Sequence, residues 1–409
     1  MTALRTGAGA TSKRGVPVSA EPAVRTARPG RTARGPRLVG ALREAAPALL
    51  AFTAVRVLGV LLLVVWGSRR GTPGLTRLGT LWDAFWYQGI AVHGYAGTAP
   101  VPGPHGLYEP YAFFPAYPAL IGAVHTVLPV PVHTAALLVA WTASLAAAWG
   151  IFAVGAHLYG HRVGVVAAVL WGVTPYAVVE SAAYSEQLFT AFAAWTCYAA
   201  LTRRWVWAGV LCLAAGLTRP TGIALAGAVC TAALWELVRR RGGWHTALGM
   251  VIAPLGFLGF LAWVGVVKGR WDGYFRVQDA WQSHFDFGRS TYQSLRDLLT
   301  QADQVWLTQV VVAAVLAGSV VLLVVSVLQR QPLVLVLFSA AMLVLALGDA
   351  AYFNSRARFL LPAFGLLLPV ANGLVRVRSR SSLVLLLASA ALLSAAYGGY
   401  VVFVYPDAP

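Results

Sequence analysis

The chain has 409 residues, of which 58% are hydrophobic and only 11% are charged, and its formal net charge is +17. A soluble globular domain carries about 25% charged residues, so this composition excludes an ordinary soluble domain. Apolar runs of about 20 residues, the length needed to cross a bilayer as a helix, recur along most of the sequence. The short alternating segments of a lipid-facing β-barrel do not occur. The composition therefore predicts an all-α polytopic membrane protein.

The excess positive charge comes from arginines that gather at the ends of the apolar runs. The positive-inside rule explains such a pattern without nucleic acid, and arginines at these places attract anionic headgroups. Membrane lipids are therefore the expected partners, and nucleic acid is not. The three cysteines, Cys197, Cys212 and Cys230, lie inside apolar runs and are interpreted as small core residues.

Residues 1–40 are rich in Ala, Gly, Pro, Thr and Arg and have no apolar period. This pattern predicts a disordered basic tail on the cytoplasmic side, which fixes the orientation of the first span. A mitochondrial transit peptide is the competing interpretation, because both kinds of segment are rich in arginine and poor in acids. Residues 41–409 are then expected to form one transmembrane domain in the cell membrane.

The apolar runs after the tail predict a bundle of about 10–12 transmembrane or partial helices. They lie near 47–66, 113–129, 134–156, 163–181, 184–202, 205–217, 221–238, 247–267, 306–328, 332–349, 358–375 and 382–404.

Basic clusters place three loops on the cytoplasmic side, at Arg203–Arg204, Arg239–Arg241 and 376–380. Counting spans forward from a cytoplasmic tail also places these loops on the cytoplasmic side only if one run between 113 and 202 is a half-span or re-entrant helix. The run 113–129, which contains Pro115 and Pro118, is the candidate.

On this topology 67–112 is the first extracytoplasmic loop, and 268–305 is the second large one. The second loop mixes aromatic and polar residues. That mixture is typical of a surface helix in the headgroup region, and an ordinary connecting loop with interfacial aromatics is the alternative.

Acidic residues are scarce, 14 in the whole chain, so their positions carry information. Five lie at or near the extracytoplasmic ends of spans, where a carboxylate is costly unless it is paired or functional: Asp83, Glu109, Glu180, Glu186 and Asp349. Asp83 is the sharpest candidate because it lies among Trp82, Trp86 and Tyr87. An interfacial aromatic belt would explain the rings but not the carboxylate.

The segment YEPYAFFPAYP, residues 108–118, contains Glu109 and three prolines. Irregular backbone at membrane depth is tolerated where it lines a cavity in the protein or water. This segment and the stretch around Asp83 are therefore expected to wall one outward-facing pocket.

Three segments, in this order, resemble the PIG-V type mannosyltransferases, which are the second mannosyltransferases of glycosylphosphatidylinositol synthesis and their bacterial relatives. They are WDAFWYQGIAVHGY at 82–95, YAFFPAYP at 111–118 and SAAYSEQLF at 181–189. LTRPTGIAL at 217–225 is similar to the arginine-glycine segment of that family. RARFLLPAFGLLLP at 356–369 resembles a region common in lipid-linked sugar transferases of the GT-C fold. The resemblance covers about residues 47–375.

The resemblance implies a GT-C membrane glycosyltransferase that moves mannose from polyprenyl-phosphate mannose to an extracytoplasmic acceptor with inversion. Asp83 would be the general base, and Arg219, Arg356 and Arg358 are candidates for holding the lipid phosphate. The other expected substrate-binding residues are Trp82, Trp86, Tyr87, Glu109, Tyr184 and Glu186. No glycine-rich phosphate loop follows a strand, in agreement with a lipid-linked donor.

Several points stay open at the level of sequence. The acceptor could be a lipoglycan, a polysaccharide or a protein. No metal-ligand spacing is evident and no cofactor is assigned, but a divalent cation shared by Asp83 and Glu186 is left open. A lipid or sugar transporter or flippase is the competing class, and a non-catalytic subunit of a mannosyltransferase complex is a third. Acidic residues concentrated on one side, and the absence of an obvious internal repeat, favour a one-sided enzyme site over a transporter.

Overall fold

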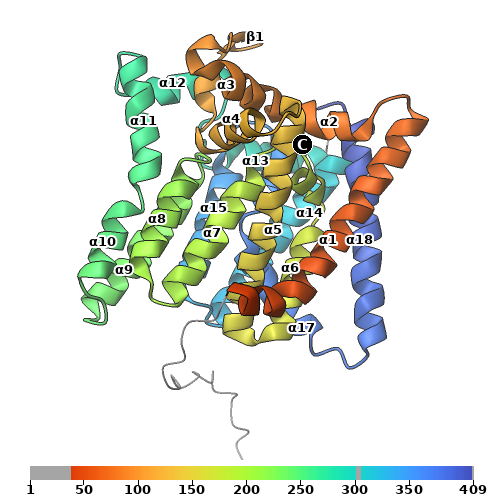
Figure 1. Cartoon of the computed structure of the whole chain (residues 1–409), viewed down its shortest axis with the longest axis vertical. Helices are drawn as coiled ribbons and strands as arrows, with labels where there is room; N and C mark the ends of the chain where they lie inside the picture. The colour runs from red at the N-terminus through yellow and green to blue at the C-terminus, as the bar shows by residue number, and fades with distance from the viewer. Residues whose placement is uncertain (1–37, 301–304, 408–409) are drawn as a thin grey trace, which may run out of the picture. The chain divides into compact units, whose positions relative to one another are not determined.

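The computed structural model describes residues 38–300 and 305–407. The predicted tail therefore lies outside the described residues, except for its last three positions, where the first helix already begins at Leu38. The rest of the chain, from Leu42, forms one unit of helices (Figure 1).

The helices, in chain order, are α1 (Leu38–Arg69), α2 (Gly74–Thr80), α3 (Asp83–Gly97), α4 (Ala116–Val127), α5 (Val132–Tyr159), α6 (His161–Gly172), α7 (Glu186–Leu201), α8 (Trp205–Gly216), α9 (Gly222–Val238), α10 (Trp244–Ile252), α11 (Leu255–Val267), α12 (Gly273–Ala280), α13 (Arg289–Thr300), α14 (Leu307–Leu328), α15 (Leu333–Gly348), α16 (Arg356–Phe359), α17 (Leu368–Leu374) and α18 (Arg380–Phe403). Four 3₁₀ turns and one short antiparallel hairpin complete the secondary structure: η1 (Pro110–Ala112), η2 (Ala177–Ser181), η3 (Phe353–Ser355), η4 (Phe364–Leu367), β1 (Val101–Gly103) and β2 (Gly106–Tyr108).

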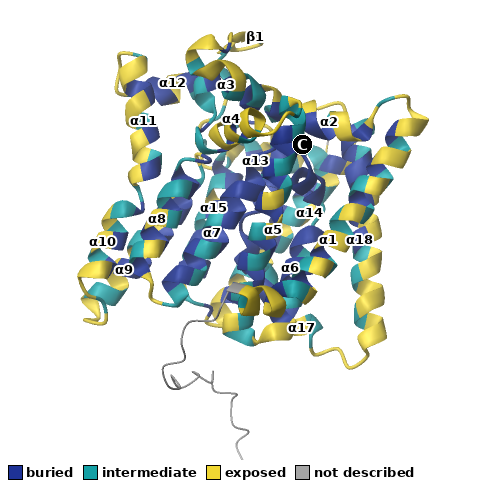
Figure 2. Ribbon diagram, in the orientation of Figure 1, coloured by how far each residue is buried: buried dark blue, intermediate teal, exposed yellow. Residues whose placement is uncertain are grey.

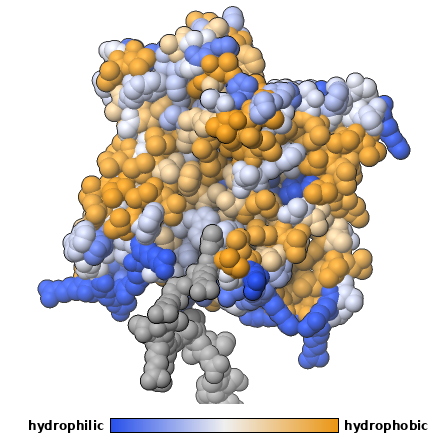
Figure 3. Space-filling model, in the orientation of Figure 1, coloured by the Kyte–Doolittle hydropathy of each residue, from blue (hydrophilic) through white to orange (hydrophobic). Residues whose placement is uncertain are grey.

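Within the described residues, five helical segments are long and apolar enough to cross a membrane: α1, α5, the α10–α11 pair, α14 and α18. A sixth is the pair around α16 and α17, if this bent segment counts as one span. Shorter apolar helices, among them α6, α8, α9 and α15, fill the space between them. An apolar belt covers these helices in Figure 3, between two more hydrophilic ends. The predicted all-α polytopic fold is confirmed.

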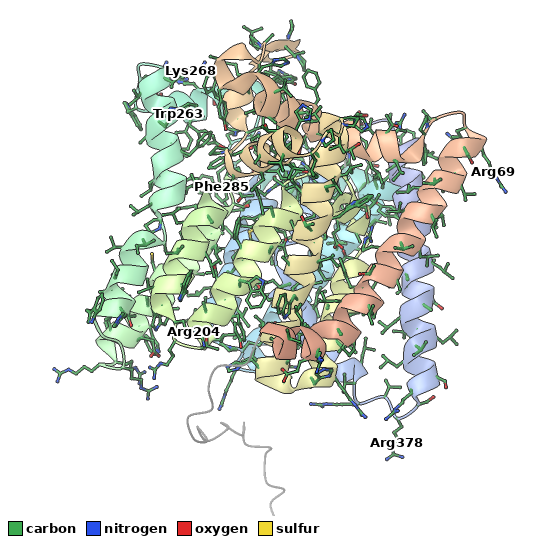
Figure 4. All side chains as sticks on the ribbon, in the orientation of Figure 1. Arg69, Arg204, Trp263, Lys268, Phe285 and Arg378 are labelled. Carbon is green, nitrogen blue, oxygen red and sulfur yellow. The ribbon has the colours of Figure 1, made fainter. Side chains whose placement is uncertain are left out.

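Helix α4 is the run that the sequence singled out as a half-span. It has 12 residues, which gives about 18 Å of helix, well short of a bilayer core of about 30 Å. It lies at the same end of the molecule as α2 and α3, and α5 then runs to the other end (Figure 1). Run 113–129 is therefore not a full span, as its prolines predicted. Figure 4 shows Arg204 and Arg378 at one end and Lys268 at the opposite end, as the count requires.

Two predicted runs are wrong in detail. In run 163–181 the α-helix stops at Gly172, and the chain then turns through Pro175 into η2. Run 358–375 is broken into α16, η4 and α17 with a bend of 75°. Pro362 lies in the break, where the missing N–H and the ring prevent a continuous helix. The loop 268–305 contains α12 and α13, so helices rather than a plain connection span most of it.

Small residues let the central helices approach closely. A Cβ atom added to Gly150 of α5 would lie 2.8 Å from the side chain of Ala194 of α7, and one on Gly155 would lie 2.9 Å from Gly164 of α6. Glycine and alanine at such contacts are the usual means of packing helices in membranes. Figure 2 shows α5 and α7 largely buried, while the outer helices expose much of their surface.

Candidate functional site

A chain of alternating charges lies at the end of the bundle that holds α3. Nη1 of Arg358 lies 3.0 Å from Oδ2 of Asp83, and its Nε lies 3.3 Å from Oε1 of Glu186. Oε2 of Glu186 in turn lies 2.7 Å from Nη1 of Arg219. We call these four residues the charge network. It joins four of the residues selected from the sequence, although they are scattered over 275 positions between Asp83 and Arg358.

Helix starts position both carboxylates. Asp83 is the first residue of α3 and Glu186 is the first residue of α7. The partial positive charge of a helix N-terminus favours a carboxylate at this place. Trp82, directly before Asp83, has φ of 53°, a value that is uncommon for a bulky residue and costs free energy. Backbone strain of this kind clusters at functional sites, and here it turns the chain so that Asp83 begins the helix.

Ser185 extends the network to Tyr87. Nη1 of Arg219 donates a hydrogen bond to Oγ of Ser185 at 3.0 Å, and this oxygen lies 2.6 Å from the hydroxyl of Tyr87. Burial raises the pKa of Tyr87 well above its ordinary value. Tyr87 therefore acts as a neutral hydrogen-bonding group. Its ring packs edge-on against Phe113, in the proline-rich segment that was expected to wall the same pocket.

Burial changes along the network. The side chain of Glu186 is 1% exposed, whereas that of Asp83 is 22% exposed. Two arginines compensate the buried carboxylate of Glu186, as a buried charge requires. In the described part of the chain, Oδ1 of Asp83 takes part in no hydrogen bond. The network thus has a closed, paired inner end and an accessible carboxylate oxygen at its outer end.

Aromatic rings support the two arginines. The guanidinium of Arg358 lies over the rings of Tyr184 and Phe359, at 5.1 Å from each centroid. The guanidinium of Arg219 lies 5.8 Å from the same ring of Phe359. Cation–π contacts of this kind are worth about 0.5–2 kcal/mol when desolvated, and they fix the planes of the guanidinium groups.

Six of the selected residues lie outside the network, and two of them reach it, Tyr87 through Ser185 and Tyr184 through Arg358. The other four are Arg356, Glu109, Trp86 and Trp82. Arg356 is fully buried, but its Nη2 donates to Oγ of Ser290 at 2.8 Å, so it ties α13 to α16. Glu109 pairs with Lys268 of the second loop. Trp86 stacks on Phe113. Trp82 precedes Asp83 but makes no polar contact to the network among the residues described.

A cavity of about 290 Å³ opens beside Arg219 and Phe359. Its other walls come from α9, α11, α15 and α12, which contributes Gln278, and from the segment after α12, which contributes Ser283 and His284. The loop 268–305, for which the sequence offered no motif, therefore forms one wall next to the network. Phe285, labelled in Figure 4, is a further residue of this loop that lines the cavity.

No group of three or more His, Cys, Asp and Glu side chains that could hold a metal ion occurs among the described residues. Asp83 and Glu186 are bridged by the guanidinium of Arg358. A cation shared by the two carboxylates, the arrangement left open by the sequence, would have to displace Arg358.

The arrangement of helices is found in a solved protein. The fold is that of ArnT. The crystal structure of ArnT from Cupriavidus metallidurans bound to undecaprenyl phosphate superposes with a TM-score of 0.54 and 16% identity, over 84% of this chain and 63% of ArnT. The apo structure of the same protein gives a TM-score of 0.52 and 17% identity, over 83% of this chain and 61% of ArnT.

The similarity to ArnT confirms the polytopic bundle of the GT-C type. The chain spans about three fifths of the length of ArnT. No protein-family profile matches the chain, and no curated protein matches it. The PIG-V resemblance of the motifs therefore remains a hypothesis.

Sequence reasoning missed Ser185, Phe359 and Arg56. Ser185 and Phe359 lie inside motifs that were quoted for their neighbours, and a serine or phenylalanine carries no signal of its own in such a chain. Arg56 did carry a signal, because it is the one charged residue of α1 between Glu44 and Arg69. A charge in the middle of a span indicates a functional or paired residue.

Proposed function

We propose that the protein is an integral-membrane glycosyltransferase that moves mannose from polyprenyl-phosphate mannose to an extracytoplasmic acceptor, with inversion at the anomeric carbon. The observation that carries the proposal is the charge network, in which an accessible carboxylate contacts the buried Arg358 and is linked through Glu186 to the buried Arg219. The active site faces away from the cytoplasm, at the end of the bundle opposite the loops that carry Arg204 and Arg378.

Asp83 is the general base in this proposal. A hydroxyl of the acceptor donates its proton to Oδ1 of Asp83 while its oxygen bonds to the anomeric carbon of the donor sugar. The bond from that carbon to the phosphate oxygen breaks, and the lipid phosphate leaves as an anion. Arg358 holds the other carboxylate oxygen at 3.0 Å and so fixes the direction in which Oδ1 points. General-base help of this kind is worth about 10²–10⁴-fold in rate.

Arg219 is the residue best placed for the lipid phosphate. It lines the cavity of about 290 Å³, and only its Nη1 is engaged by Glu186 and Ser185 among the described contacts. The rest of its planar fork is available for a phosphate oxygen. A phosphate leaving group is a stable anion, so it requires nearby positive charge rather than a proton donor. Arg358 contributes the second positive charge.

Two further observations support polyprenyl-phosphate mannose as the donor. The ArnT structure of the same fold was solved with bound undecaprenyl phosphate, which is a polyprenyl phosphate. The segments around Asp83, 111–118 and 181–189 resemble the PIG-V type mannosyltransferases, which supports mannose as the sugar. The acceptor is a lipoglycan, a polysaccharide or a protein on the outer side.

The test is a transfer assay in membranes that contain the full chain, with radiolabelled polyprenyl-phosphate mannose as donor. We expect label to appear in a new product, which mass spectrometry then identifies. Polyprenyl-phosphate glucose and a nucleotide-linked mannose are the parallel donors. Transfer from the glucose donor alone would contradict mannose and keep the lipid-linked class. Transfer from the nucleotide donor alone, or from none of the three, would overturn the proposal.

A further inference from the structure

A second pair of charged residues lies between α1, α5 and η2, apart from the charge network. Nη1 of Arg56 donates to the carbonyl oxygen of Gly172 at 2.9 Å, and its Nη2 donates to Oγ of Ser181 at 2.7 Å. Its Nε lies 4.0 Å from Oε2 of Glu180. Arg56 lies within a candidate membrane span, where an ionisable side chain marks a functional site by default.

Glu180 is left with unused hydrogen-bonding capacity. The residue is 1% exposed, and neither of its carboxylate oxygens has a hydrogen-bond partner among the described residues. The guanidinium at 4.0 Å is too far for a hydrogen bond. A buried carboxylate without such partners is costly, and an exception of this kind needs a physical explanation.

The unpartnered carboxylate lines a cavity of about 380 Å³, a volume within the range of small-molecule sites, about 300–1,000 Å³. The other lining residues are mainly apolar and come from α1 and α5. Val57 and Leu61 of α1 and Leu145 of α5 form its rim and are 49%, 57% and 40% exposed. Both helices are long and apolar enough to span a membrane, so the cavity opens toward lipid tails.

We propose that this cavity binds a lipid with a single apolar chain that ends in a neutral hydroxyl, with the hydroxyl on Glu180 and the chain along Val57, Leu61 and Leu145. A hydroxyl both donates and accepts, so it satisfies the carboxyl group whether this is charged or protonated. The charges disfavour other headgroups. An ammonium group would meet Arg56 as a like charge, and a phosphate would meet Glu180.

The site is distinct from the charge network, but the same segment connects them. Glu180 and Ser181 belong to η2, and five residues after Ser181 the chain reaches Glu186 of the network. Trp141 of α5 donates from Nε1 to the carbonyl oxygen of Ser181 at 3.0 Å and also lines the cavity. The proposal does not depend on the transferase activity, because it rests on this cavity alone.

Trp141 provides the measurement. The full chain is purified in detergent and titrated with a long-chain alcohol that carries bromine on its chain, and with the methyl ether of the same alcohol. Bromine quenches the fluorescence of a neighbouring indole. We expect saturable quenching by the alcohol, about tenfold weaker binding of the ether, and loss of the saturable component in Trp141→Phe. A brominated alkylammonium of the same chain length is the third probe.

Two variants tie the binding to the cavity. Glu180→Gln keeps the shape of the side chain but removes the charge, and we expect about tenfold weaker binding of the alcohol with no change for the ether. Val57→Phe fills the rim and should abolish saturable quenching. Val65→Phe is the matched control, because Val65 is 53% exposed on the same helix but does not line the cavity.

Equal affinity for the alcohol and its ether would overturn the hydroxyl site. Preferred binding of the alkylammonium would show a site for a cationic headgroup and would likewise overturn the hydroxyl site. Absence of saturable quenching by any probe, in a protein that unfolds at the wild-type temperature, would mean that the cavity holds water only and would also overturn the proposal.

Discussion

Glu180 and Glu186 are six residues apart and both are 1% exposed, but their surroundings differ. Glu186 lies within 3.3 Å of two arginines and forms the inner end of a paired network. Glu180 has one arginine, at 4.0 Å, and lines a cavity. The comparison teaches that burial of a carboxylate does not define its role. The carboxylate with two close arginines belongs to the proposed reaction site, and the one with a single distant arginine belongs to the proposed ligand cavity.

The largest expected effect is on stability, from Glu186→Gln set against Glu180→Gln. Removing one partner of a tight buried pair leaves uncompensated charge and costs about 3–5 kcal/mol. We therefore expect Glu186→Gln to lower the unfolding temperature in detergent strongly, because two arginines lose a short contact. Glu180→Gln should lower it little. Equal losses for the two variants would contradict the difference described above.

The next prediction separates two buried arginines, Arg219 of the charge network and Arg356 outside it. Arg219→Lys and Arg356→Lys both keep the positive charge and lose the planar fork. We expect Arg219→Lys to raise the KM for the lipid donor about tenfold, because a lysine cannot bind Glu186 and a phosphate oxygen together. Arg356→Lys should leave this KM unchanged and lower only the unfolding temperature, since Arg356 contacts Ser290.

A similar increase in the KM for the lipid donor in both variants would contradict the assignment of Arg219 as the residue that binds the lipid phosphate. An unchanged KM in Arg219→Lys would do the same, and would leave Arg358 as the remaining candidate for the phosphate.

A smaller effect is expected from Tyr87→Phe. The variant removes the hydroxyl that lies 2.6 Å from Oγ of Ser185 and keeps the ring against Phe113 and Tyr117. The loss of one buried hydrogen bond is worth about 1 kcal/mol. We expect a fall in transfer rate of about fivefold, the equivalent of this free energy at 25 °C. A loss above a hundredfold would mean that Tyr87 takes part in the reaction itself.

The smallest effect is expected from Glu109→Gln. Glu109 and Lys268 are each about one quarter exposed, and such pairs contribute about 0–1 kcal/mol. The unfolding temperature and the transfer rate should both stay close to wild type. A large loss of the transfer rate with an unchanged unfolding temperature would indicate that Glu109 contacts the substrate.

Part of this molecule could be predicted from its sequence because charges are scarce in it. Asp83, Glu186, Arg219 and Arg358 stood out against apolar runs, and the structure brings all four together. The sequence could not separate Arg358 from Arg356. Residues two apart on a helix face different ways, and which of them faces Asp83, 275 positions earlier, depends on long-range packing.

The remaining differences come from long-range packing. The partner of Glu109 is Lys268, 159 residues away, and no local pattern indicates such a contact. The span count stayed ambiguous because an apolar run of 17 residues can cross a membrane or stop short of it. Only the position of α4 beside α3 decides this. The cavity at Glu180 likewise depends on how α1 and α5 pack around η2.

The most direct test of the proposed mechanism is Asp83→Asn, measured as the rate of mannose transfer from polyprenyl-phosphate mannose in membranes with equal amounts of folded protein. Asp297→Asn, on the exposed face of α13, is the control. We predict a fall of about 10²–10⁴-fold for Asp83→Asn, because the amide cannot take the proton of the acceptor, with donor binding retained. Transfer at a near wild-type rate would contradict the assignment of Asp83 as the base.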